Sequence, residues 1–241
     1  MNDPSSTEAN GASADPKERT PRQVIPDLWL FAPNRDTQGG SSWLLETEML
    51  SVLIDCPAAT STNLSFLQSR TDGWIVLTGR SGHGRCEQIH RKLGWPIVVQ
   101  EQEAYLLPGI GEVTTFEQTH QLGDGVRLLW TPGPSPGACV LHVSPHAWAG
   151  GHGLCCGRLL IPVAPGRVMP LRNRSNFHWL RQLRSLDILM KWLPAGSPDW
   201  IASGAPLGAL RGQNLVWEGA RQLASLDLEA LATSLSDPFN P

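Results

Sequence analysis

Short apolar runs, separated by glycine, proline and Asp-Gly turns, recur along the chain and predict β-strands. The predicted strands cover residues 24–31, 42–46, 49–57, 74–77, 96–99, 126–130, 138–143, 154–157 and 200–202, and residues 121–125 predict a hairpin between two of them. Four further stretches, residues 62–68, 86–93, 177–192 and 214–235, carry apolar side chains at helical spacing. Strands that alternate with amphipathic helices predict one α/β (α+β) domain, and the sequence contains no internal repeat.

Residues 1–22 differ in composition from the rest of the chain. They are rich in Ser, Asp, Glu, Asn, Ala and Pro, with no large aliphatic or aromatic residue after Met1. Such a segment cannot offset its ordering entropy by burial, so we expect a disordered N-terminal tail and a domain that spans residues 23–241. The sequence offers neither a secretion signal nor a run of about 18 apolar residues, so we expect a cytoplasmic protein without membrane contact.

The composition excludes some classes of partner. The net charge is −3 and no run of Lys and Arg exceeds two residues, so the electrostatic footprint of a nucleic-acid-binding protein is missing. Five cysteines without regular spacing are expected to be buried or reduced thiols: Cys56, Cys86, Cys139, Cys155 and Cys156. Ten tryptophans are expected to pack in the core, and this packing role is favoured also for Trp148 over a contact made by its glycine-rich loop.

Four segments end predicted strands in loops rich in glycine or proline. They read IVLTGRSGHG at residues 75–84, WTPGPSPG at 130–137, CCGRLL at 155–160 and WIASGAPL at 200–207. In this order, and together with the buried strand that ends at Asp55, they resemble the metal-binding motifs of the metallo-β-lactamase superfamily. Residues 176–189, with Gln182 and Ser185, are similar to a helix in a cyanobacterial and plastid branch of that superfamily. The resemblance implies a four-layer αββα sandwich and a metal-dependent hydrolase that holds zinc.

The chain departs from these motifs at the metal-ligand positions. By the resemblance these positions hold Gly79, Ser81, His83, Pro134, Arg158 and Ala205. Zinc binds imidazole nitrogen, thiolate or carboxylate, and a hydrolytic site needs several such ligands with one open position. Glycine, proline and alanine supply no donor, and the guanidinium of Arg158 repels a dication. We therefore expect a lost zinc site and no metal cofactor.

Two other chemistries stay open at the level of the sequence. A relocated zinc site is suggested by the short spacings of Cys139, His142, His146, His152, Cys155 and Cys156. Cys139 and His142, however, are three residues apart on a predicted strand and therefore face opposite sides of the sheet. Ser81, two residues before His83, is a candidate nucleophile. The glycines around it favour a relaxed loop over the fixed geometry that catalysis requires.

The sequence favours a catalytically inactive pseudoenzyme that acts as a binding or scaffold module through a basic cleft. In this fold the loops after the strand ends form a groove, which is expected to bring together Arg80, His83, Arg85 and Arg158. A buried guanidinium needs a partner, which can be a carboxylate such as Asp55, a backbone carbonyl or a bound anion. The expected partner is a small anionic ligand or a protein, and a homodimer stays open because members of this fold often pair. The alternative is a metal-dependent hydrolase with a displaced or mononuclear site.

Overall fold

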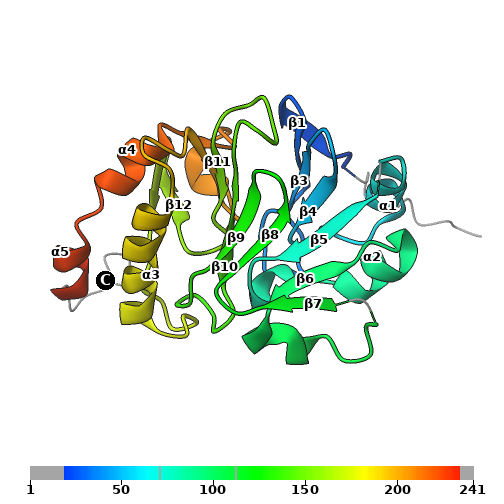
Figure 1. The fold of residues 1–241 in the computed structure, drawn as a ribbon, viewed down its shortest axis with the longest axis horizontal. Coiled ribbons are helices and arrows are strands. Elements are labelled where there is room, and N and C mark those ends of the chain that lie inside the picture. The colour runs from blue at the N-terminus through cyan, green and yellow to red at the C-terminus, as the bar shows by residue number, and fades with distance from the viewer. Residues whose placement is uncertain (1–18, 71, 112, 234–241) are drawn as a thin grey trace, which may run out of the picture.

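The computed structural model describes residues 19–70, 72–111 and 113–233. Two large sheets face each other in the middle of the molecule, and helices cover the outer side of each (Figure 1). Helices α1 (Ser61–Gln68) and α2 (Cys86–Leu93) lie outside the first sheet. Helices α3 (Trp179–Trp192), α4 (Gly219–Ala224) and α5 (Leu228–Thr233) lie outside the second. The layers follow the predicted order of helix, sheet, sheet and helix.

The first sheet has seven strands whose spatial order is their order in the sequence. They are β1 (Arg22–Ile25), β2 (Leu28–Leu30), β3 (Trp43–Glu46), β4 (Ser51–Ile54), β5 (Gly73–Leu77), β6 (Ile97–Gln100) and β7 (Val113–Phe116). Strands β1 to β4 pair antiparallel, whereas β4 to β7 pair parallel. Two parallel neighbours need a crossover connection between them. Helix α1 connects β4 to β5, α2 connects β5 to β6, and the 3₁₀-helix η2 (Glu101–Leu106) connects β6 to β7.

The second sheet has six strands in the order β15-β14-β11-β10-β9-β8. Their bounds are β8 (Thr119–Gly123), β9 (Val126–Trp130), β10 (Cys139–Val143), β11 (Gly153–Cys155), β14 (Trp200–Ala202) and β15 (Val216–Trp217). Only β11 and β14 pair parallel among these strands. A separate hairpin, β12 (Ile161–Ala164) and β13 (Arg167–Met169), follows β11, and a short 3₁₀-helix, η3 (Gly208–Leu210), follows β14.

Apolar side chains fill three layers, one between the sheets and one beneath the helices on each side. Successive residues of a strand serve different layers: Leu141 faces the other sheet, whereas Val140 faces the layer beneath α3. Full burial of one such side chain contributes about 1.5–3 kcal/mol. Trp43 links the two sheets directly, because its indole nitrogen donates a hydrogen bond to the carbonyl of Ser203 at 3.0 Å.

Most predicted elements are confirmed, with full agreement for α2, β9 and β14. Residues 24–31 are not one strand, because Asp27 adopts a left-handed φ of 58° and turns the chain into the β1–β2 hairpin. Residues 214–235 are not one helix within the described residues. Val216 pairs with β14 instead, and Glu218, at a φ of 56°, redirects the chain into α4. The strands β7, β12 and β13 were not predicted.

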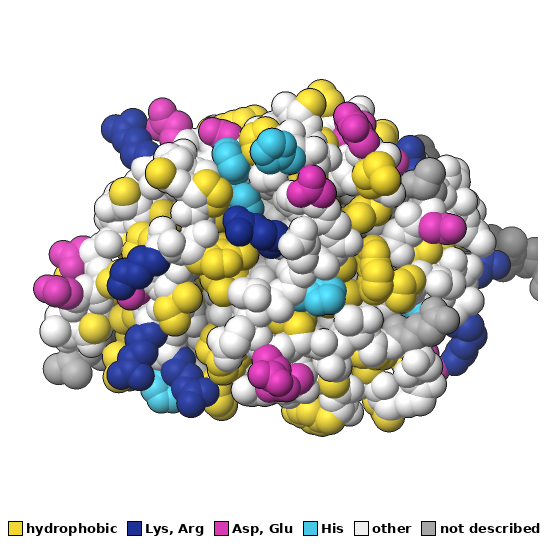
Figure 2. Space-filling model, in the orientation of Figure 1, with side chains coloured by type: hydrophobic (Ala, Val, Ile, Leu, Met, Phe, Trp, Pro, Cys, Tyr) yellow, Lys and Arg dark blue, Asp and Glu magenta, His cyan; other side chains and the backbone are white. Residues whose placement is uncertain are grey.

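The cysteines, Trp148 and the basic side chains were the subject of expectations from composition. All five cysteines are buried free thiols, as predicted. Trp148 packs edge-on against Trp200 with ring centres 5.4 Å apart, which confirms its packing role. Within the described ranges no helix is long and apolar enough to cross a membrane. On the face drawn in Figure 2, Lys and Arg side chains form separate groups, several of them over α3. Most of the predicted tail, residues 1–18, lies outside the described residues.

Arg22, which the sequence placed in the tail, is the first residue of β1, and its guanidinium donates a hydrogen bond to Asn214 Oδ1 at 2.6 Å. Limited digestion of the native protein with trypsin should therefore cut after the exposed Arg19 and spare the bond after Arg22. N-terminal sequencing of the resistant fragment should give Thr20 as its first residue. A fragment that starts at Gln23 would mean that the start of β1 detaches.

Candidate functional site

A cleft of about 630 Å³ opens where the loops after β5, β9, β11 and β14 meet. Its wall contains all six positions at which the resemblance places metal ligands: Gly79, Ser81, His83, Pro134, Arg158 and Ala205. These residues come from four separate segments of the chain. The structure thus brings together the residues that the resemblance assigns to ligand positions.

Asp55 follows β4 directly and lies at the cleft with only 5% of its surface exposed. Its Oδ1 accepts a hydrogen bond from the backbone amide of Thr78 at 2.8 Å, and its Oδ2 accepts one from the Thr78 hydroxyl at 2.7 Å. Gly82 approaches so closely that a Cβ at this position would overlap Asp55 Oδ1. The carboxylate therefore holds the loop after β5 against the end of β4.

Burial raises the pKa of Asp55 to about 6. The two hydrogen bonds from Thr78 and the positive charge of Arg158 lower this pKa, and the negative charge of Glu103 raises it, but burial has the largest effect. A solvated aspartate has a pKa of about 3.9. Asp55 thus changes its charge within a range of pH in which ordinary aspartates stay ionised.

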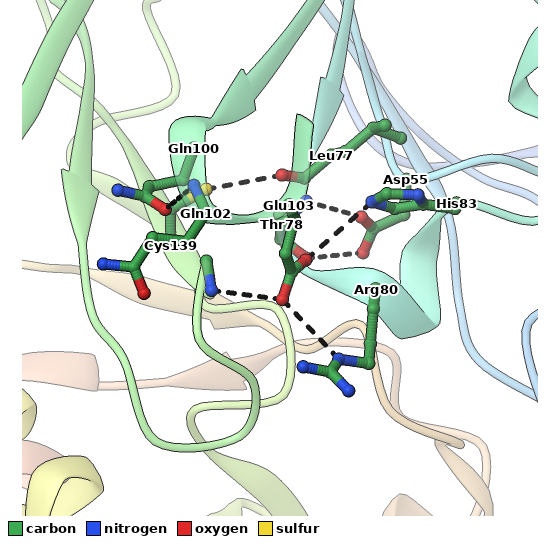
Figure 3. Close-up of polar contacts among 10 residues, drawn as sticks. Asp55, Leu77, Thr78, Arg80, His83, Gln100, Gln102, Glu103 and Cys139 are labelled. Atoms are coloured by element: carbon green, nitrogen blue, oxygen red, sulfur yellow. Dashed lines mark hydrogen bonds and ion pairs between the residues drawn. The ribbon is translucent and has the colours of Figure 1, made fainter. Parts of the chain in front are cut away.

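Glu103, on η2, is a carboxylate with no exposed surface. Its Oε1 accepts a hydrogen bond from the amide of Gly137 at 3.1 Å and lies 3.7 Å from Nε of Arg80. Its Oε2 lies 3.8 Å from Nε2 of His83 (Figure 3). Arg80 and His83 belong to the loop after β5, whereas Gly137 belongs to the loop after β9. One buried side chain therefore joins the two loops that carry most of the ligand positions.

The imidazole of His83 is 9% exposed and faces Glu103. Burial lowers the pKa of His83, an effect that the charge of Glu103 opposes and the charge of Arg80 adds to. His83 is therefore neutral at pH 7. Its Nε2 has no hydrogen-bond partner among the described residues.

The loop of residues 131–137 is supported from behind by α3. The hydroxyl of Ser185 donates a hydrogen bond to the carbonyl of Pro132 at 2.7 Å. Within this loop lies Pro134, which the resemblance assigns to a histidine position, and Ser135 follows it on the cleft wall. The Oγ of Ser135 is buried and has no hydrogen-bond partner in the part of the chain that the structure describes. A buried hydroxyl without a partner is costly, so this group is available to a ligand.

Arg158, which the resemblance assigns to the position of the bridging carboxylate, also lines the cleft. Its Nη2 donates a hydrogen bond to the carbonyl of Thr37 at 2.7 Å, and its Nη1 donates one to Oε1 of Gln38 at 3.4 Å. Burial lowers the pKa of Arg158, and the charge of Asp55 opposes this effect. The sequence left three kinds of partner open for Arg158: a carboxylate, a backbone carbonyl or a bound anion. The structure shows a backbone carbonyl, that of Thr37.

Three of the four basic residues expected in the cleft, Arg80, His83 and Arg158, lie on its wall. Arg85 lies elsewhere: its Nε is 3.1 Å from Oδ2 of Asp36, and 62% of its side chain is exposed. The chain turns at Gly84, with a left-handed φ of 46°, just before α2 begins. This turn directs Arg85 away from the cleft.

Among the described residues, the histidines and cysteines outside the cleft form no cluster that could hold a metal ion. His142 Nε2 lies 3.1 Å from His152 Nδ1, with the rings stacked, which the sequence did not predict. Cys139 and Cys155 face the layer between the sheets, and Cys156 faces the layer beneath α3. No group of three or more His, Cys, Asp or Glu side chains among the described residues could hold a metal ion.

The donors on the cleft wall do not fit the zinc pair of the family either. Among the described residues of the wall, Asp55 and His83 have side chains of the kinds that bind zinc. Both oxygens of Asp55 accept hydrogen bonds from Thr78, His83 Nε2 faces Glu103, and Arg158 adds a fixed positive charge. A dication at this place would meet too few donors and a guanidinium.

Ser81 lies in the 3₁₀-turn η1 (Arg80–Gly82), and among the described residues no hydrogen bond joins it to His83. A nucleophile needs a base within hydrogen-bond reach, so this pair is not preassembled. Glu103 and Ser135 were missed by sequence reasoning. Glu103 had one usable signal, since it lies three residues after Gln100, the end of the buried strand β6, where polar side chains of α/β folds converge.

Comparison with solved structures shows that the chain has the metallo-β-lactamase fold. An archaeal metallo-β-lactamase superfamily protein from Sulfolobus tokodaii is similar over 84% of this chain and 84% of its own, with a TM-score of 0.56 and 17% identity. A B3 metallo-β-lactamase with an active-site glutamic acid is similar over 89% of both chains, with a TM-score of 0.57 and 17% identity. TTHA1623, in a di-iron-bound form, is similar over 84% of this chain and 96% of its own, with a TM-score of 0.56 and 19% identity. Neither a protein-family profile nor a curated sequence matches the chain. The predicted four-layer αββα sandwich is confirmed.

Glu103→Ala should lower the free energy of unfolding by about 2–4 kcal/mol, because it leaves the Gly137 amide unpaired and opens a cavity. Glu103→Gln keeps the shape and one acceptor and should cost less. Glu101→Ala, at an exposed position of the same 3₁₀-helix, is the matched control. Urea denaturation at pH 7 measures all three variants. Equal stability of the two alanine variants would contradict the joining role of Glu103.

Asp55→Asn should remove a pH-dependent part of the stability. The pKa of Asp55 in the folded protein, about 6, exceeds its unfolded value, so folding favours the protonated carboxyl. Its stabilising contribution is therefore complete below about pH 4 and is lost as the pH rises through about 6. Between these limits the stability of the natural protein relative to Asp55→Asn should fall by about 1–3 kcal/mol.

Urea denaturation of both proteins in steps of pH measures this difference. The titrations of His83 and His142, which act in the opposite direction, are present in both proteins and cancel in the subtraction. A difference in stability that does not change with pH would contradict the raised pKa of Asp55.

Proposed function

We propose that this chain is a metallo-β-lactamase-fold protein without the metal chemistry of that fold, and that it binds a small anionic ligand in its cleft. The observation that carries the proposal is the guanidinium of Arg158 on the cleft wall. The family resemblance assigns this residue to the position of a bridging carboxylate. A fixed positive charge in place of a metal-binding negative one reverses the charge that the site favours.

The two buried carboxylates support the absence of a metal. Asp55 and Glu103 hold the loops of the cleft through hydrogen bonds and ion pairs within the protein. Such loops have no need of a dication to bring them together. The family resemblance on its own favours the alternative, a metal-dependent hydrolase with a displaced or mononuclear site, and the donor set counts against it.

The class of ligand follows from the hydrogen-bond donors of the cleft wall that the described residues leave unused. Arg158 has five N–H donors, of which the Thr37 and Gln38 oxygens take two. Arg80 is 47% exposed on its side chain and has one distant contact with Glu103. Ser135 adds a buried hydroxyl without a partner among the described residues. Planar guanidinium groups bind carboxylate, phosphate and sulfate in two-pronged contacts, so these oxyanions are the proposed class.

Elemental analysis for Zn, Fe and Mn should find well under one metal ion per chain in protein purified without a histidine tag. A chelator should leave the melting temperature unchanged, because a dication bound only to the folded state would stabilise it by mass action. Stoichiometric metal, with a melting temperature that falls in chelator, would establish the alternative function.

Phosphate and sulfate should raise the melting temperature of the natural protein and should do so less in Arg158→Ala. Loss of a charge-assisted hydrogen bond costs about 1.5–3 kcal/mol, which weakens the Kd roughly 10–100-fold. Titration calorimetry measures that change. Binding should also tighten as the pH falls through about 6, since Asp55 then loses its negative charge.

Arg85→Ala is the matched control, because Arg85 pairs with Asp36 outside the cleft. Arg158→Lys serves as a second variant that keeps the charge but loses the planar fork. If Arg158→Ala and Arg85→Ala bind phosphate as tightly as the natural protein, the cleft is not the anion site.

A further inference from the structure

Two of the five cysteines lie together beside the cleft. Cys56 follows Asp55 at the end of β4, and Cys86 is the first residue of α2. The loop between Gly82 and Cys86 packs against Cys56: the Cys56 amide donates a hydrogen bond to the Gly82 carbonyl at 2.8 Å. A Cβ on Gly84 would lie 3.4 Å from Cys56 Cβ. Cys56 and Cys86 belong to the same buried cluster, and each thiol affects the acidity of the other.

The two thiols differ in access. Cys86 lines a second cavity of about 510 Å³, which shares His83 and Leu106 with the cleft wall. Cys56 has no exposed surface and does not line this cavity. A small reagent that enters the second cavity therefore meets Cys86 first.

The two thiols also differ in acidity. The Cys56 thiol lowers the pKa of Cys86, and backbone amides at the start of α2 lower it further, against the effect of burial. Burial and the neighbouring Cys86 raise the pKa of Cys56. Cys86 is thus the better source of thiolate, the form in which sulfur attacks an electrophile.

The other three cysteines lack these features. Burial raises the pKa of Cys139, Cys155 and Cys156, in the last case to about 12. Their side chains pack within the apolar layers on the two sides of the second sheet. They supply an internal reference for thiols that should stay unreactive.

We propose that Cys86 and Cys56 form a redox-sensitive dithiol that a hydroperoxide converts to a disulfide. The Cys86 thiolate attacks one oxygen of the hydroperoxide, the O–O bond breaks, and the other oxygen leaves and takes up a proton, which gives Cys86 sulfenic acid. The Cys56 sulfur then loses its proton and displaces the hydroxyl of the sulfenic acid as water, which forms the S–S bond. The two thiols lose two electrons, and the hydroperoxide gains them.

The bond would couple oxidation to the cleft. It would fix the start of α2 to the end of β4, and the loop between them carries Arg80 and His83 of the cleft wall. This chemistry needs no ligand in the cleft, so it does not depend on the proposed anion binding. The peroxide experiment below can therefore fail or succeed independently of the phosphate titration.

The test treats the reduced, folded protein with hydrogen peroxide, blocks the remaining thiols by alkylation and digests it with trypsin without reductant. Cys56 then lies on the peptide of residues 36–70, and Cys86 lies on residues 86–91. Mass spectrometry should find these two peptides joined, with the loss of two hydrogens. Cys139, Cys155 and Cys156 share one peptide, residues 128–158, which should be fully alkylated.

Variants assign the order of the steps. Cys56→Ser should stop at Cys86 sulfenic acid, which dimedone traps, whereas Cys86→Ser should leave Cys56 reduced. Cys139→Ser, the matched control, should still form the cross-link. The proposal is overturned if peroxide leaves both thiols of the folded natural protein reduced. It is equally overturned if Cys86 oxidises without joining Cys56, or if the protein unfolded in urea forms the cross-link as fast as the folded one.

Discussion

The contact of the buried Glu103 carboxylate with both loops of the cleft is the constraint on which the site depends. A carboxylate without exposed surface is costly unless charges or hydrogen bonds compensate it. Glu103 contacts one amide of the loop after β9, and in the loop after β5 it contacts the Arg80 guanidinium and the neutral imidazole of His83. The loops must therefore stay in register with each other, since a shift of either would leave the charge uncompensated. The shape of the cleft follows from this requirement.

Asp55 and Arg158, on the cleft wall, are likewise held by hydrogen bonds within the protein. Asp55 is held by the two donors of Thr78, and Arg158 is held by the carbonyl of Thr37. Each charged group near the cleft thus has a partner within the protein before any ligand binds. A site built for two dications has the opposite character, because its carboxylates and imidazoles stay close together only when the metal is bound. Charges compensated by the chain itself explain how this fold can keep its loops without that donor set.

The pattern of apolar runs was enough to predict most strands and helices, because strand and helix periods differ and glycine and proline mark the turns. The order of the four layers followed from the family resemblance. The six residues that the resemblance assigns to ligand positions lie on one cleft wall, since each follows a strand whose end faces the same edge. The pairing of Glu103 with Arg80 and His83 could not be derived, because it depends on where a 3₁₀-helix places one side chain. The contact between His142 and His152 likewise depends on the pairing of β10 with β11, which no local pattern fixes.

The glycines at residues 79–84 suggested a relaxed loop, and the structure corrects this expectation. Gly82 donates a hydrogen bond to the carbonyl of Gly79 at 2.8 Å and accepts one from the amide of Cys56 at 2.8 Å. Its lack of a side chain lets Asp55 approach, so the glycine serves close packing here and not mobility. A loop pinned in this way presents Arg80 and His83 in one arrangement before a ligand arrives. Binding then loses little conformational entropy at the loop, and the same fixed geometry keeps Cys86 beside Cys56.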